Sequence, residues 1–203
     1  MDRDLALEAL VQAVPYVGSS IATLYFGNKS KKQFQRLTEF YKELCKDLEE
    51  VKSSLSPISE HSEDELIILI EEIHEKIENE RIESKKRLYK NLYKKSLIHP
   101  VKTENFNERK YFVDIISTLS EPHFKILSFL FNKRNKIPIG DIIFKGIDNS
   151  LIKGFIQQLE NYGLIILEIN NIQGFSNSNS ISINKNALIT NLGEKFHYFC
   201  LID

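Results

Sequence analysis

Cysteine is scarce in this 203-residue chain, which contains Cys45 and Cys200 and no CxxC pair. Two isolated cysteines exclude a disulfide framework and indicate free thiols in a reducing compartment. An excess of charge is also missing, because the formal net charge is −1. General nucleic-acid binders and binders of anionic membranes usually carry a basic excess, so the composition argues against both functions.

A basic leader is missing as well. The first eight residues are acidic, which predicts no secretory signal and a cytoplasmic protein. Residues 9–28 carry no charge and just reach the ~20 residues that a bilayer span requires. Pro15 and Gly18 interrupt the apolar helical stripe of this segment, which favours a broken hairpin that packs on the next helix. The alternative is a membrane-active effector that inserts residues 9–28.

Motifs that carry chemistry are missing from the chain. Residues 27–30, Gly-Asn-Lys-Ser, end like a phosphate-binding loop, but asparagine replaces the glycine that must precede the lysine. His197 and Cys200 lie i, i+3 on a predicted helix, yet zinc takes three or four protein ligands and no second pair is visible. No serine, cysteine or lysine lies in a nucleophile motif. We therefore predict a non-enzymatic protein with no catalytic residue, cofactor or metal.

The clearest periodicity lies in residues 30–55, which are predicted to form one amphipathic helix. Apolar residues recur there at alternating spacings of three and four. They form a seam of Phe34, Leu37, Tyr41, Leu44, Leu48, Val51 and Leu55. The seam favours packing within a helical bundle of the same chain. An intermolecular coiled coil, and hence a homo-oligomer, is the alternative.

The next region, residues 62–98, is helical and strongly charged. Charged residues between 60 and 80 are almost all acidic, and those between 81 and 102 are almost all basic. This order suits the macrodipole of one long helix, but the apolar stripe is interrupted around 79–86, which fits two helices equally well. Residues 1–100 are thus predicted to form a helical module of hairpin, heptad helix and charged region.

Residues 106–203 have a different rhythm, in which helices are followed by a small hairpin. Helices are predicted over 107–119, 123–131, 139–145 and 149–162, strands over 164–169 and 181–183, and a last helix after Thr190. The predicted fold class is mainly α, with an N-terminal helical bundle and a C-terminal domain that contains a small β-hairpin.

Two segments of the C-terminal domain resemble a known family. Residues 151–165, LIKGFIQQLENYGLI, look like the third helix and first wing strand of a winged-helix domain. Residues 187–196, ALITNLGEKF, look like its closing step, in which the second wing strand enters a final helix. The resemblance implies a winged-helix domain over 106–203. It implies little about function, because this fold hosts many functions.

A shorter resemblance concerns the N-terminal half. Residues 15–18, Pro-Tyr-Val-Gly, and 36–40, Arg-Leu-Thr-Glu-Phe, are similar to segments of uncharacterised helical bacterial and phage-linked proteins. This resemblance points to mobile-element or anti-phage defence biology and carries over no functional residue.

The charges of the C-terminal half bear on DNA binding, the usual function of a winged helix. Basic and acidic residues nearly balance there, and residues 161–184, which include the wing, have no lysine or arginine. Phosphate contacts supply much of DNA affinity, so an interaction domain that docks on a protein partner is favoured. A transcription regulator that dimerises through 30–55 is the alternative. The residues expected to contact a partner or DNA are Lys153, Gln157, Gln158 and Asn161.

Overall fold

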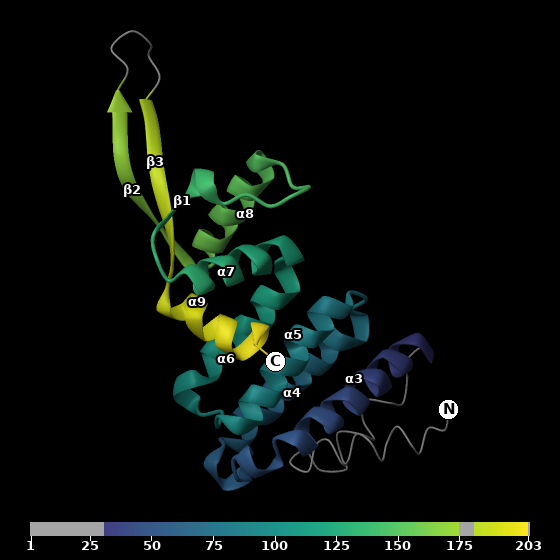
Figure 1. Cartoon of the computed structure of the whole chain (residues 1–203). Coiled ribbons are helices and arrows are strands. Elements are labelled where there is room, and N and C mark those ends of the chain that lie inside the picture. Colours follow the sequence, from purple (N-terminus) through teal and green to yellow (C-terminus); the bar gives the residue numbers. More distant parts are fainter. Residues whose placement is uncertain (1–30, 175–180, 203) are drawn as a thin grey trace. The chain divides into compact units, whose positions relative to one another are not determined.

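The computed structural model describes residues 31–174 and 181–202, which divide into two compact units, 31–118 and 119–202 (Figure 1). The first unit consists of helices, and the second combines helices with a three-stranded antiparallel sheet. The predicted class, mainly α with a small antiparallel sheet in the C-terminal part, is confirmed. Residues 9–28 lie outside the described residues. Among the helices of the described ranges, none is long and apolar enough to cross a membrane.

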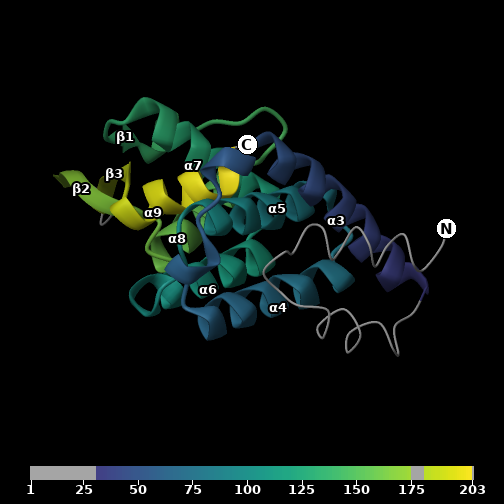
Figure 2. The same ribbon diagram turned by 90° about the horizontal axis from the view of Figure 1, so that it is seen from below.

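In its described part, the first unit is a bundle of α3 (Lys31–Glu50), α4 (Glu63–Asn79), α5 (Glu83–Ile98) and α6 (Thr103–Thr118). Both α3 and α6 pack against α4 and α5, and Figure 2 shows α3 beside α5 and α6 beside α4. Two short 3-10 turns, η1 (Lys52–Ser54) and η2 (Ile58–Glu60), lie between α3 and α4. The core of the unit is formed where the apolar faces of the four helices meet.

The position of α6 corrects the predicted domain boundary. We expected the second domain to begin at residue 106, but α6 packs in the first unit. Its residues Phe112, Val113, Ile115 and Ile116 are all buried. Such closely spaced apolar residues cover more than one helical stripe, so the helix needs partners on more than one side. The boundary lies between residues 118 and 119.

The heptad helix is shorter than predicted. The apolar seam continues to Leu55, but α3 ends at Glu50. The reason is tertiary, because the N–H and Oγ of Ser56 donate to carbonyl groups at the end of α5 (3.0 and 2.7 Å) and draw the chain back. Val51 and Leu55 are half-buried beyond the helix, and the side chain of Phe34 is outside the described ones.

The charged region forms two helices rather than one. The break comes at Glu80, whose Oε1 accepts the N–H groups of Arg81 and Ile82, both at 2.8 Å. These bonds satisfy donors that precede α5. The acidic and basic runs therefore lie on separate helices. The basic run pairs with α3 instead, where Lys90 Nζ lies 3.1 Å from Asp47 Oδ2.

The second unit begins with α7 (Glu121–Lys133), β1 (Ile137–Pro138), the 3-10 turn η3 (Ile139–Asp141) and α8 (Asn149–Asn161). It continues with β2 (Ile165–Gly174), β3 (Ile181–Ile189), α9 (Asn191–Phe196) and the π-helical turn η4 (His197–Leu201). The strand order is β1-β3-β2, and both neighbouring pairs are antiparallel. The core lies where α7 and α8 cover the buried face of the sheet at Ile165, Ala187 and Ile189.

The strands differ most from expectation. The predicted polar turn begins at residue 170, yet β2 continues to Gly174 with a register shift between Ile169 and Asn171. The predicted short helix 139–145 is only the turn η3, and β1 was not predicted. Cross-strand pairing decides strand length, so polar residues extend a strand once they have a partner.

Gly193 is required where α9 meets the start of β2. Thr190 Oγ1 accepts the N–H of Gly193 (3.0 Å) and donates to the carbonyl of Gly163 (2.6 Å). A Cβ on Gly193 would overlap the carbonyl oxygen of Leu164 and lie 2.8 Å from Ile189 Cγ1. Glycine is the residue that permits this close approach of two backbones.

Candidate functional site

A groove of about 680 Å³ lies in the second unit between α8, η3 and the sheet. We call it the α8–sheet groove. The two helical elements line it with Ile139, Gly140, Asp141, Lys153, Ile156 and Gln157. The sheet lines it with Leu167 of β2 and with residues 184–186 of β3. The groove therefore joins apolar side chains, amides and charges beside a strand.

Main-chain groups of β3 are open along this groove. β1 pairs with β3 at two positions, the second being Pro138 opposite Asn186, and the chain then turns into η3. The other edge of β3 is paired with β2 along residues 181–189. Within the described residues, residues 181–185 of β3 therefore have no strand on the β1 side.

The ladder shows which main-chain groups face this open edge. The N–H of Leu167 donates to Glu160 Oε1 on α8 (3.3 Å) and so points away from β3. Leu167 lies opposite Ala187, which must then direct its own N–H and C=O towards β1. Because this direction alternates along a strand, Lys185, two residues away, directs its N–H and C=O to the same edge.

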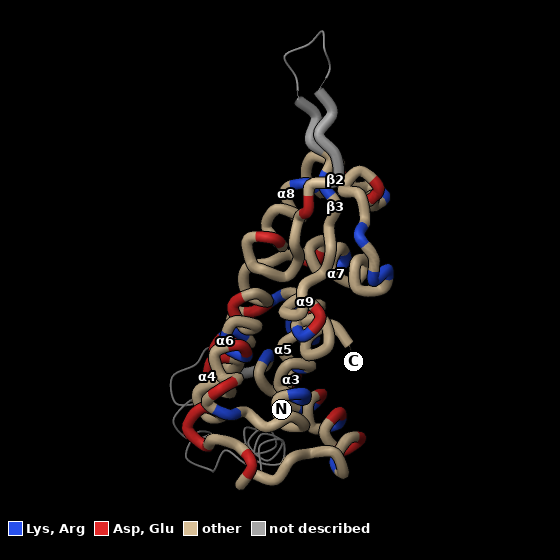
Figure 3. The backbone as a smooth tube through the Cα atoms, turned by 90° about the vertical axis from the view of Figure 1, so that its left-hand side faces the viewer, with Lys and Arg blue, Asp and Glu red and all other residues tan. Residues whose placement is uncertain are grey.

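Two lysines flank the groove, Lys153 on α8 and Lys185 on β3. Neither forms an ion pair with another residue of the described ranges, and Asp141 is the one carboxylate of the lining. Charge is otherwise sparse on α8, which carries one lysine and one glutamate, Glu160 (Figure 3). The groove therefore carries a small positive charge that is local to its margins.

The structure separates the four predicted contact residues. Lys153 and Gln157 line the groove. The Gln157 amide donates to a glutamate of the same helix (2.6 Å) and to Asn161 Oδ1 (3.3 Å). Gln158 lies on the other flank of α8, where its Oε1 is 2.5 Å from His123 Nε2 of α7. Polar groups of Gln157, Gln158 and Asn161 are thus engaged within the unit.

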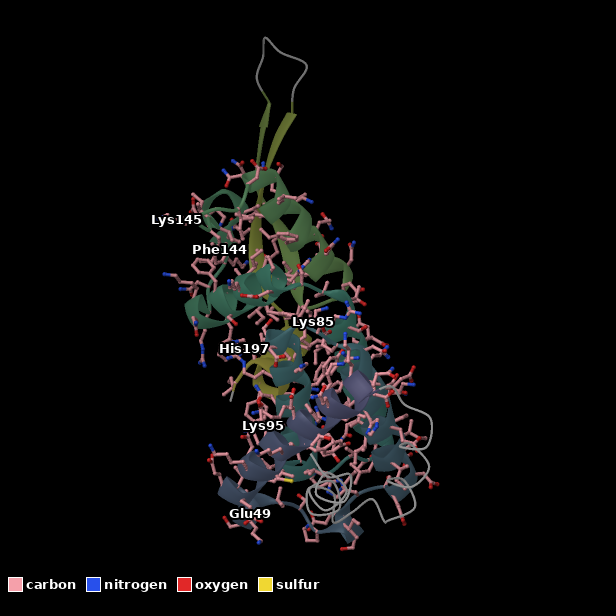
Figure 4. All side chains as sticks on the ribbon, turned by 90° about the vertical axis from the view of Figure 1, so that its right-hand side faces the viewer. Glu49, Lys85, Lys95, Phe144, Lys145 and His197 are labelled. Atoms are coloured by element: carbon pink, nitrogen blue, oxygen red, sulfur yellow. The ribbon has the colours of Figure 1, made fainter. Side chains whose placement is uncertain are left out.

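Local contacts hold α8 in place beside the sheet. Asp148 caps its N-terminus by accepting the N–H of Ser150 (2.8 Å). Hydrogen bonds from the Ser150 side chain and backbone lower the pKa of the Asp148 carboxyl. The preceding loop is anchored by Phe144 (labelled in Figure 4), whose ring meets that of Phe129 edge-on, with centroids 6.0 Å apart.

The predicted interaction seam lies in the core of the first unit. Its buried members are Leu37, Tyr41, Leu44 and Leu48. They lie on α3, which packs against α4 and α5 of the same chain. The seam is therefore accounted for by packing within one molecule.

A row of buried, hydrogen-bonded polar side chains crosses this core. The Tyr41 hydroxyl lies 3.1 Å from His74 Nδ1, and His74 Nε2 lies 3.2 Å from Glu78 Oε1. Burial raises the pKa of the Tyr41 hydroxyl, which therefore stays protonated. The three groups satisfy one another's hydrogen bonds, as buried polar groups must. We interpret them as a structural network, since none of them lines a groove described here.

A second groove, of about 460 Å³, lies in the first unit between α3 and α5. Its lining holds three acidic and three basic side chains, and four of the six form ion pairs with each other. Lys90 Nζ lies 3.4 Å from Glu43 Oε2, and Lys86 Nζ lies 2.7 Å from Glu83 Oε1. Because its acidic and basic side chains are equal in number, this groove carries no net charge and is the weaker candidate.

His197 and Cys200, the pair considered for metal binding, are both buried. The His197 ring (labelled in Figure 4) stacks on Phe131 with centroids 3.8 Å apart. Burial lowers the pKa of His197, as expected for a neutral ring packed in a core. Across residues 31–174 and 181–202, no cluster of three or more His, Cys, Asp or Glu side chains could hold a metal ion.

Sequence reasoning identified one wall of the groove and missed the other. Lys153 and Gln157 were predicted, but Lys185 stands just past the predicted wing. Gly140 was placed inside a helix over 139–145, whereas it lies in a turn after β1. The signal for this turn was the Ile-Pro-Ile-Gly sequence of 137–140, because proline and glycine so close together interrupt a helix.

Comparison with known proteins assigns no family to this arrangement. No protein-family model, curated protein or solved structure matches the chain. The class that the structure defines is a mainly α protein with a small antiparallel sheet.

Proposed function

We propose that this chain is a non-enzymatic docking protein, whose second unit is a winged-helix domain that binds a protein partner in the α8–sheet groove. The order of helix, short strand, turn, helix and hairpin supports the winged-helix assignment, as does the strand order β1-β3-β2. In this assignment α7 is the first helix, the 3-10 turn η3 stands in the place of the second, and α8 is the third. The strands β2 and β3 form the wing. The helical first unit acts as a scaffold.

The state of the polar side chains on α8 carries this proposal. A helix that reads DNA needs amide edges for the bases and cations for the phosphates. On α8 the amides of Gln157 and Gln158 are bonded within the unit, and Lys153 is the only cation. What stays accessible is a groove that includes the apolar side chains of Ile139, Ile156 and Leu167 and lies beside an open strand edge. Extended protein segments are bound by such features.

The lining of the groove also favours binding over catalysis. It combines amides and aliphatic side chains with Lys153, Lys185 and Asp141. No nucleophile in this lining is hydrogen-bonded to a base in the described structure, as covalent catalysis requires. The groove is thus suited to hold a chain rather than to transform it.

A DNA-binding regulator is the second candidate, and one observation favours it. The outer face of α8 is exposed at Ser150, Gly154 and Asn161. A Cβ added to Gly154 would meet no atom within 4 Å. An open helix face of this kind can enter a major groove.

Two glycine variants separate these candidates. Gly140 lies in the groove and Gly154 on the outer face of α8, and a Cβ meets no atom within 4 Å at either position. We expect Gly140→Tyr to abolish capture of a protein partner from the native host. Gly154→Asp is the matched control, which should retain capture. Hydrogen exchange of both variants checks that the second unit stays folded.

A DNA-binding assay at rising salt completes this test. The docking function predicts no site-specific complex at ~0.15 M salt. A complex that survives there and is lost in Gly154→Asp would instead establish the regulator. Capture from infected and uninfected cells tests whether the resemblance to phage-linked proteins extends to function.

A further inference from the structure

The α8–sheet groove combines an open strand edge with two lysines that have no ionic partner among the described residues. Resting on the docking function proposed above, we infer that its occupant is an extended, acidic segment of the partner protein, which adds as a strand to the open edge of β3. Main-chain direction, side-chain environment and charge each support this occupant.

The main chain offers the first support. Beyond Pro138 the chain leaves the sheet, and the groove opens beside Lys185 where a longer β1 would have continued. Lys185 directs its N–H and C=O to this edge, as the ladder requires. The open edge comprises residues 181–185 and, at about 3.4 Å per residue, extends about 17 Å. An unpaired edge of this length is a template for a strand of another chain.

The walls of the groove supply side-chain contacts to such a strand. Successive side chains of an added strand point alternately to the two faces of the sheet. Those on the α8 side would reach Ile139 and Ile156, with Lys153 at the margin. Apolar and acidic residues are therefore both accommodated on that face. Proline is excluded at every second position of the segment, where the main-chain N–H faces β3 and is needed as a donor.

The charge of the groove selects an acidic segment. Lys153 and Lys185 lie on different walls, and neither is paired with a carboxylate of the described residues. Asp141 offsets only one of these two charges. Carboxylates of the partner would supply the missing counter-charges and set the position of the strand along the groove.

A second copy of the chain fits this edge less well. Two β3 strands paired edge to edge would add the lysine of a second copy and no carboxylate, since residues 181–185 are Ile-Ser-Ile-Asn-Lys. Lysine on an edge strand is a known device against self-pairing. A nucleic acid would meet the two lysines, but its backbone does not match the alternating donors and acceptors of a strand edge.

Peptide selection tests this inference directly. A displayed library of random short peptides is selected on the full chain, and the enriched peptides are synthesised and titrated by fluorescence polarisation. We expect enrichment of carboxylates and exclusion of proline from alternate positions. Lys153→Glu and Lys185→Glu should each weaken binding about tenfold. The matched control is Lys145→Glu, an exposed lysine of the same unit outside the groove, which should bind like the parent.

Methylation of single peptide nitrogens tests the main-chain pairing. Loss of one N–H should weaken binding about tenfold at every second position and leave the positions between nearly unchanged. This period of two distinguishes strand addition from attraction to charge alone. Sedimentation of the free chain should show no dimer formed through the β3 edge. Such a dimer would be recognised because Lys185→Glu changes its stability.

Each contrary result has a defined meaning. Peptides that bind without sensitivity to either groove lysine, or without the period of two, overturn the inference but leave a protein-docking function intact. An empty selection also overturns it, as does a dimer that occupies the β3 edge. A salt-resistant DNA complex that is lost in Gly154→Asp overturns the docking function itself.

Discussion

The two units of the molecule bury different chemistry. The first encloses ionisable and amide side chains, including His74, Glu78, Asn91, Lys94 and Arg109. In the described part of the second, the buried polar side chains are two histidines, His123 and His197. A buried polar group is costly unless it is hydrogen-bonded, so the first unit tolerates fewer arrangements of its helices than an apolar core would.

Exposed apolar surface follows the opposite pattern. Among the described side chains, the most exposed large hydrophobic ones are Ile143 (68 %) and Ile169 (59 %), both in the second unit. This unit also carries the open strand edge. The first unit thus directs polar side chains into its core, whereas the second leaves apolar side chains and main-chain groups of a strand exposed.

The largest expected effect comes from truncation of a buried side chain in the core of the first unit. Leu44 is fully buried, so Leu44→Ala should reduce the free energy of unfolding by roughly 2–5 kcal/mol. The chain has no tryptophan, so hydrogen exchange read by mass spectrometry is the measurement that resolves the two units. Protection should fall in α3–α6, and the exposed Lys46→Ala serves as control. An effect that depends on protein concentration would show the seam to be intermolecular.

The second unit should lose stability when the turn between β3 and α9 is altered at Gly193. Gly193→Ala forces a Cβ into the Leu164 carbonyl, and we expect a loss of about 3 kcal/mol from this overpacking. Hydrogen exchange should then accelerate in β2, β3 and α9 while the first unit keeps its protection. Equal loss of protection in both units would mean that they unfold together. The difference between the two units would then not include their stability.

The polar interior of the first unit is tested by Tyr41→Phe. The variant removes the hydroxyl that bonds His74 Nδ1 and leaves a buried ring nitrogen without this partner. We expect a loss of about 1–3 kcal/mol in denaturant titration. The control Tyr198→Phe removes a hydroxyl from an exposed residue and should change stability by less than about 0.5 kcal/mol. Similar values for both variants would show that the hydrogen bond between Tyr41 and His74 adds no stability.

The smallest expected effect is a gain. Gly154 lies inside α8 with open space around it, so Gly154→Ala should stabilise the second unit by about 0.5–1 kcal/mol. The gain arises because alanine restricts the unfolded chain more than glycine does. It should appear as slower hydrogen exchange in α8, with capture of the partner unchanged. Loss of capture would place the partner on the outer face of α8 rather than in the groove.

Helices were predicted better than strands. α8 was expected over 149–162 and extends over 149–161, because Asp148 caps its start and Gly163, with φ of 69°, follows its end. These signals are local to the helix. The length of β2 and the existence of β1 depend on pairing with β3, which no local pattern encodes.

The candidate site was predicted only where it lies on a helix. Lys153 and Gln157 could be named because they are polar residues of the helix predicted over 149–162, the segment that resembles the third helix of a winged-helix domain. Their roles differ from those expected, since the Gln157 amide is held by neighbours on its own helix. Hydrogen bonds between side chains one turn apart depend on rotamers, and spacing does not specify rotamers.

Periodicity was thus sufficient to place the heptad residues Leu37, Tyr41, Leu44 and Leu48 in a core, because a helix of this pattern must bury one face. It was not sufficient to decide where α3 ends or that α6 packs in the first unit. Both depend on contacts with other helices.

The α8–sheet groove depends on the tertiary structure in the same way. Lys153 and Lys185 lie far apart in the chain, and strand register together with the early departure of β1 brings them to one groove, because pairing joins residues that are distant in sequence.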